Sequence, residues 1–240
     1  MAITHVQDLT PAADSTSGGV TSIPCSFPSA TTAGDALVLV IGTTYTGVTT
    51  DAVTGISDGG GNSWISVVAE GNGACMVSTW WSRSTASAGT ITISLRSSLN
   101  VAVVGAEFSG ILEVSNFNAA SGTSTSPASG SVSTTGVVLA VGGTSYTFPY
   151  NGSATSYTPT SGWTTIGTAA SSDTHHGDTN VAVAADYNPS VSSSTQDAPT
   201  LGTSESWTCS IAIFTSPVTQ IPPLLETRSY LQAVNRAGTY

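Results

Sequence analysis

Residues 57–64, SDGGGNSW, are the stretch whose composition comes closest to a catalytic or metal-binding motif. Residues 55–59 match the G-x-S-x-G pattern of hydrolase nucleophiles, and Asp58 and Asn62 offer two hard oxygens to a calcium ion. The hydrolase motif works only where a strand turns into a helix, but here the chain leads into another strand. We therefore interpret the stretch as a glycine-rich turn, with a calcium site as the alternative, and Trp64 as a core residue.

A second polar cluster lies at residues 171–180, SSDTHHGDTN. Adjacent histidines on a strand point to opposite faces, so they share one metal ion only if the segment is a loop. The sequence favours an exposed loop, and a metal or pH-sensitive contact is the alternative. The residues concerned are Asp173, His175, His176 and Asp178.

Two further features of the expected strands, Glu107 and the pair Trp80 and Trp81, are candidates for catalysis or binding. Glu107 is an isolated carboxylate in an apolar segment, and glycosidase chemistry would need a second carboxylate within about 10 Å. We expect Glu107 to reach solvent or an arginine. Trp80 and Trp81 are adjacent, so one ring should face outward, where it would stack on a sugar or pack at a subunit contact.

Composition excludes several functional classes. The chain has a net charge of −10, four arginines and no lysine, so it lacks the clustered cations that nucleic acids and anionic membranes require. Without lysine there is no Schiff-base chemistry. The three cysteines show no CxxC spacing, which predicts buried thiols rather than a metal site. We expect no catalytic residue, no cofactor and no metal.

The N-terminus, MAITHVQDL, has no basic or apolar region typical of a secretory signal, and no apolar run approaches the roughly 20 residues of a membrane helix. We therefore expect synthesis in the cytoplasm without secretion.

Short runs of β-branched and aromatic residues, separated by Gly, Ser, Asn and Pro, predict an all-β protein. Residues 36–41 are apolar on both faces and predict a central strand covered on both sides, whereas residues 90–95 alternate and predict a strand with one face in water. The expected strands are 20–27, 36–46, 63–69, 75–82, 90–95, 100–108, 137–147, 162–168, 180–187 and 206–215, with weaker ones near 131 and 200.

Two halves of the chain resemble each other, which indicates a duplicated unit. The aligned pairs are Tyr45 with Tyr146 (offset 101), Trp64 with Trp163 (offset 99) and Phe108 with Phe214 (offset 106). We predict a jelly-roll-like β-sandwich over 20–216, built from halves 20–112 and 130–216, after an N-terminal segment 1–19. Two tandem sandwiches joined by a linker at 119–136 are the alternative.

Residues 217–240 differ in character and hold two of the four arginines. Pro223 can start a helix and Gly238 can end it, so we expect an extended strap followed by a short helix. This helix would dock on a neighbouring subunit, or else fold back on its own sandwich or fray. The expected contact residues are Leu224, Leu225, Arg228, Tyr230, Leu231, Val234 and Arg236.

The succession AGDALVLVIG, ISDGGGNSWISVVAEGN, MVSTWWSRSTASAGTITISL and VAVVGAEFSGI resembles β-sandwich domains of virion proteins from tailed bacteriophages, especially those of actinobacteria. The resemblance covers about 20–112, and 130–216 through the repeat. It implies a homo-oligomeric capsid decoration or head-surface protein that docks on the major capsid protein, or a minor tail component bound to tail proteins. A similar pattern in adhesion and carbohydrate-binding modules keeps a host surface glycan as an alternative partner. The resemblance implies no catalytic residues.

Overall fold

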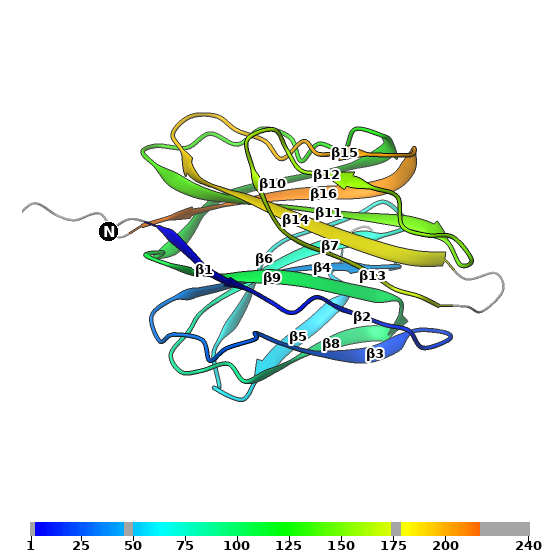
Figure 1. Cartoon of the computed structure of the whole chain (residues 1–240), viewed down its shortest axis with the longest axis horizontal. Coiled ribbons are helices and arrows are strands. Elements are labelled where there is room, and N and C mark those ends of the chain that lie inside the picture. The colour runs from blue at the N-terminus through cyan, green and yellow to red at the C-terminus, as the bar shows by residue number, and fades with distance from the viewer. Residues whose placement is uncertain (1–2, 46–49, 174–178, 217–240) are drawn as a thin grey trace, which may run out of the picture.

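A computed structural model describes residues 3–45, 50–173 and 179–216 (Figure 1). The described residues form an all-β structure, as predicted, in which strands are stacked in layers. The predicted strap and helix at 217–240 lie outside the described residues. So do His175, His176 and Asp178.

The two largest layers are central sheets with antiparallel strands. The first central sheet has the order β1 (Thr4–Asp8), β9 (Val101–Ser109), β4 (Ala36–Thr43), β7 (Met76–Arg83) and β6 (Trp64–Gly71), with β2 (Ala12–Ala13) also paired to β9. The second central sheet has the order β10 (Glu113–Ser124), β16 (Glu205–Thr215), β11 (Val138–Pro149), β14 (Thr179–Val191) and β13 (Thr164–Ala170).

A smaller layer covers the outer face of each central sheet. The first outer sheet consists of β3 (Val20–Ser26), β8 (Thr90–Leu99) and β5 (Val53–Asp58), and the outer ribbon on the second half consists of β12 (Tyr157–Thr158) and β15 (Thr200–Leu201). In Figure 1 the first outer sheet lies at the bottom and the outer ribbon at the top, with the central sheets between them.

The hydrophobic pattern of β4 explains this layering. Val38 and Val40 face the core between the two central sheets, whereas Leu37, Leu39 and Ile41 face the core under the first outer sheet. All eight residues of β4 are buried, which confirms the prediction of a strand covered on both sides. The alternation predicted for residues 90–95 is also confirmed, because its isoleucines and leucine are buried and Ser94 is exposed.

The internal repeat is confirmed by the strand order. Strands β1, β9, β4, β7 and β6 correspond in order to β10, β16, β11, β14 and β13. Phe108 lies opposite Ala36 and Phe214 lies opposite Leu139, so the β4 and β11 registers differ by 139 − 36 = 103. The sequence alignment had an offset of 101 for this strand. A shift of two residues preserves which side chains face which core.

Several elements escaped the sequence prediction. Strands β1 and β2 lie in the segment 1–19 that was expected to precede the sandwich, and both pair with β9. Strand β10 runs through the first part of 119–136, the linker of the tandem-sandwich alternative, and pairs with β16 from Glu113 to Ser124. Strands β5 and β12 were also missed.

Candidate functional site

Residues 59–63 form a turn between β5 and β6, as the glycine-rich sequence predicted. The Asp58 carboxylate accepts hydrogen bonds from the backbone N–H groups of Gly60 (3.0 Å) and Asn62 (3.1 Å), from Asn62 Nδ2 (3.0 Å) and from Trp64 Nε1 (2.9 Å). Asn62 Oδ1 in turn accepts from the Thr85 N–H group at 2.7 Å. The carboxylate is thus used to hold the turn together. Since the chain continues into strand β6, the helix of a hydrolase elbow does not follow.

Glu107 does not reach solvent, so that expectation was wrong. Its side chain is fully buried and accepts hydrogen bonds from Gln7 Nε2 (2.5 Å) and the Thr32 N–H group (2.6 Å). Burial and then the charge of Glu107 raise the pKa of the neighbouring Asp35 carboxyl. Because Glu107 is completely covered, a substrate has no access to it.

The tryptophan pair is also more buried than expected. Trp80 and Trp81 do point to opposite faces of β7, but a core covers each face. Trp80 is 9% exposed and packs under the first outer sheet, so surface stacking on a sugar is wrong for this residue. Trp81 is partly buried and meets Phe214 edge-to-face, with ring centroids 6.1 Å apart, in the core between the central sheets.

All three cysteines are free and buried, as predicted. Burial raises the pKa of the Cys25 thiol to about 12 and that of Cys75 to about 11. Thiols with such pKa values are almost entirely protonated at neutral pH, so they are poor nucleophiles and poor metal ligands.

Of the polar cluster at 171–180, the structure describes Asp173 but not the two histidines. Asp173 is held by buried Asn180, whose Oδ1 accepts from the Asp173 N–H group at 2.7 Å and whose Nδ2 donates to the Asp173 carbonyl at 3.1 Å. Within residues 3–45, 50–173 and 179–216, no three His, Cys, Asp or Glu side chains lie close enough to hold a metal ion.

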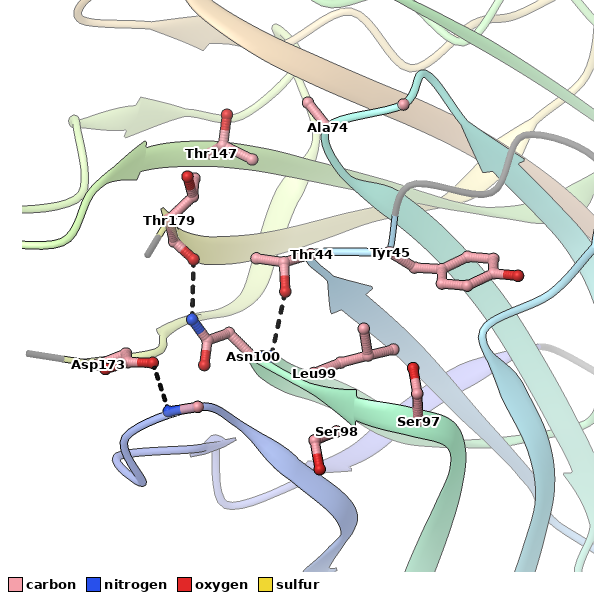
Figure 2. A pocket seen from close by; sticks show the side chains of 12 residues that line it. Thr44, Tyr45, Ala74, Ser97, Ser98, Leu99, Asn100, Thr147, Asp173 and Thr179 are labelled. Carbon is pink, nitrogen blue, oxygen red and sulfur yellow. Dashed lines mark hydrogen bonds between the residues drawn. The ribbon is translucent and has the colours of Figure 1, made fainter. Parts of the chain in front are cut away.

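Asp173 borders a cleft of about 620 Å³ between the two halves of the molecule (Figure 2). The first half contributes Gly18 before β3, the segment that follows β4, the turn between β6 and β7, and the end of β8 with Asn100. The second half contributes β11, the segment that follows β13, and β14. The lining residues are Gly18, Thr44, Tyr45, Gly73, Ala74, Ser97, Ser98, Leu99, Asn100, Thr147, Asp173 and Thr179.

Asn100 joins the two halves of the molecule at this cleft. Its Nδ2 donates to the Thr179 carbonyl at 2.8 Å, which joins the halves, and its N–H group donates to Thr44 Oγ1 at 3.1 Å. Its Oδ1 is buried and has no hydrogen-bond donor among the described residues. In Figure 2 this oxygen is turned away from Thr179.

A pair of buried carboxyl groups lies beneath the outer ribbon, and sequence reasoning missed it. Asp186 of β14 and Asp197 are both 0% exposed. A Cβ atom placed on Gly142 would lie 2.7 Å from Asp186 Oδ1 and 2.5 Å from Asp197 Oδ2, so these two oxygens converge above the glycine. The pair belongs to the interior, and its only signal in the sequence was a glycine within an apolar strand, which often marks a close approach.

Neutral donors hold this acid pair in place. Asp186 Oδ2 accepts from the Thr160 N–H group at 2.8 Å, and Asp197 Oδ1 accepts from Thr160 Oγ1 at 2.6 Å. Burial raises the pKa of both carboxyls, and for Asp186 the charge of Asp197 raises it further. The arrangement fits one proton shared between the two acids.

Comparison with known proteins identified no relative: no protein-family model, no curated protein and no solved structure matches this chain. Among the described residues, no helix is long and apolar enough to cross a membrane.

Proposed function

We propose that this chain is a non-enzymatic structural protein of a tailed-bacteriophage virion, a capsid decoration protein that docks on the major capsid protein at the head surface. The observation that supports this role best is the shared core between the central sheets. Both halves fill it, with Val38, Val40 and Phe108 on one side and Val141 and Phe214 on the other. Two repeats thus make one rigid block, as a particle surface requires.

The sides of this block offer surfaces for homo-oligomerisation. Strands β6 and β10 are the edge strands on one side of the two central sheets, and Ser121 Oγ of β10 donates to Glu70 Oε1 of β6 at 3.0 Å. Ile65 on β6 is 55% exposed and Phe117 on β10 is 53% exposed. Exposed edge strands with apolar side chains are favourable sites for contact with another subunit.

The C-terminal segment is the proposed attachment to the capsid. Strand β16 ends at Thr215, whose carbonyl accepts from the Leu112 N–H group at 2.8 Å, so the chain leaves the body beside the start of β10. We propose that the body folds without residues 217–240, because the described strands pair with one another in the two central sheets.

Particle analysis tests this proposal. We expect the protein to be found by mass spectrometry in purified virions, at a copy number that follows the number of capsid subunits. A few copies per particle would instead indicate the minor tail role. A chain that ends at Ser216 should fold but fail to enter particles. Full incorporation of this truncated chain would contradict the role of the C-terminal segment, and absence of the full chain from virions would contradict the whole proposal.

A second candidate function is a receptor- or carbohydrate-binding module. The observation that favours it is the cleft between the halves, whose lining is rich in hydroxyl groups. Such a role is compatible with a place on the virion surface, and it does not require one.

A further inference from the structure

We propose that the cleft between the two halves is a binding site for a neutral saccharide. This inference rests on the second candidate function and is independent of the virion proposal. The cleft is formed by seven separate segments of the chain, three of them from the second half, so the site exists only when the two repeats are packed together. Its volume of about 620 Å³ lies within the usual range for ligand sites and suits a di- or trisaccharide.

The side chains that line the cleft determine the class of ligand. Hydroxyl groups come from Thr44, Ser97, Ser98, Thr147 and Thr179. Each hydroxyl can donate one hydrogen bond and accept others, which matches the alternating donor and acceptor character of sugar hydroxyls. A ligand with few polar groups would leave these side chains without partners and is therefore disfavoured.

Charge disfavours anionic ligands. The net charge of the chain is −10 and the described lining includes the acid Asp173, so a neutral ligand is favoured over phosphates and acidic sugars. A calcium ion takes six to eight oxygen ligands, usually with several carboxylates, but Asp173 is the only acid of the described lining. Its Oδ2 already accepts from the Gly18 N–H group at 2.9 Å.

Two features would orient a sugar in the cleft. The Asn100 side chain is fixed by the bond from its Nδ2 to the Thr179 carbonyl, and its backbone N–H group fixes Thr44 Oγ1, so the hydroxyl groups beside it are held in place. At the other side, Tyr45 contributes an aromatic ring, with its hydroxyl pointing away from Asn100 in Figure 2. Aromatic rings pack against the apolar faces of sugar rings, while fixed polar groups bind the hydroxyls at the edges.

Hydrogen bonds connect the walls of the cleft in the absence of a ligand. Asn180 fixes the backbone of Asp173 and also donates to the Tyr150 carbonyl at 3.1 Å. On the first half, the Thr44 N–H group donates to the Asn100 carbonyl at 3.0 Å. A preformed site loses less conformational entropy on binding, so even a weak neutral ligand should give a localised signal.

The test is a titration of the full-length protein with neutral disaccharides, followed by the amide chemical shifts in NMR spectra. Cellobiose, maltose, lactose and diacetylchitobiose are suitable probes, and glucuronate serves as the anionic comparison. We expect at least one disaccharide to shift signals of Thr44, Asn100 and Thr147, and glucuronate to have no effect. Shifts spread over the surface, equal binding of glucuronate, or no shifts with any probe would overturn the proposal.

Matched variants show whether the cleft is the binding site. Ser98→Trp places a large side chain at an exposed position of the rim and should weaken binding roughly tenfold or more. Ser94→Trp makes the same change on the same strand outside the cleft and should leave binding unchanged. If Ser98→Trp does not fold, Tyr45→Ala replaces it, with the same expected loss. Equal binding by a folded cleft variant and Ser94→Trp would overturn the assignment, whether or not the protein enters virions.

Discussion

The buried pair Asp186 and Asp197 should make the protein less stable as the pH rises. An aspartate in the unfolded chain has a pKa of about 3.9. In the folded chain, burial first and the charge of Asp197 second raise the pKa of Asp186. Above the unfolded pKa, the folded protein therefore keeps a proton that the unfolded chain releases. The stabilisation is complete below the unfolded pKa and is lost as the pH rises towards the raised folded pKa.

The size of this effect follows from linkage. Each retained proton lowers the free energy of unfolding by about 1.4 kcal/mol per pH unit. If one proton stays on the pair between pH 5 and pH 7, the loss over these two units is roughly 3 kcal/mol. This is a large part of the stability of a typical domain.

The change Asp186→Asn should remove most of this dependence. The new amide keeps the shape of the carboxyl, its oxygen can accept from the Thr160 N–H group, and its NH₂ group can donate to Asp197 in place of the shared proton. Asp197 then ionises beside a donor rather than beside a second acid. Because burial still raises the pKa of Asp197, we expect the variant to lose roughly 1 kcal/mol between pH 5 and pH 7 and to be more stable than the unchanged protein at pH 7.

Urea unfolding, followed by tryptophan fluorescence at constant ionic strength, measures these free energies. Glu113→Gln is the control, because it removes an exposed carboxylate from β10 and should leave the slope with pH as it was. Stability that is constant or increasing from pH 5 to pH 7 would refute the reasoning, and so would an unchanged slope in Asp186→Asn.

Three further predictions concern packing and hydrogen bonding. For each, the free energy of unfolding is measured in urea at fixed pH. Gly142→Ala should destabilise the protein by several kcal/mol, on the order of 3, because its Cβ would overlap the acid pair, whereas Gly55→Ala meets nothing within 4 Å and should change little. Phe108→Ala and Phe214→Ala should each cost about 3–5 kcal/mol, since both rings are fully buried in the same core; a much smaller cost for one of them would contradict equal roles for the two halves. Asp58→Ala should cost about 2 kcal/mol through loss of the bonds to Asn62 and Trp64, and an unchanged midpoint would show that the turn does not depend on this carboxylate.

The strands predicted correctly from the sequence are those whose hydrophobic pattern depends on which of their faces is buried. Continuous apolar runs, as in β4, and clean alternation, as in β8, depend on which faces are covered, and both were recognised. Strand β10 was missed because it is an edge strand rich in Asn, Ser and Ala, and its extended form depends on pairing with β16. Local sequence carries little information about such pairing.

The same distinction between local and long-range interactions applies to the candidate sites. The turn at 57–64 was predicted because its donors and acceptors lie within a few residues of Asp58. The burial of Glu107 was not predicted, because its hydrogen-bond donors come from Gln7 and Thr32, which are distant from it in the sequence. The cleft also depends on contacts between distant segments, such as the bond from Asn100 to Thr179.

The acid pair occupies space that is open because a glycine and a large apolar residue exchange positions on neighbouring strands between the two repeats. In the first half, Leu39 pairs with Gly105, and a Cβ on that glycine would lie 2.7 Å from Leu39 Cδ2. The register places Gly142 at the position of Leu39, paired with Ile211 at the position of Gly105.

The large residue has thus moved to the neighbouring strand, and the space above Gly142 holds two carboxyl groups where the first half holds a leucine. The same backbone accommodates both arrangements. Gly105 leaves room for Leu39 in the first half, and Gly142 leaves room for the two carboxyl groups in the second half. The first half uses this space for apolar packing under its outer sheet, and the second half uses it for a polar interior whose stability depends on pH.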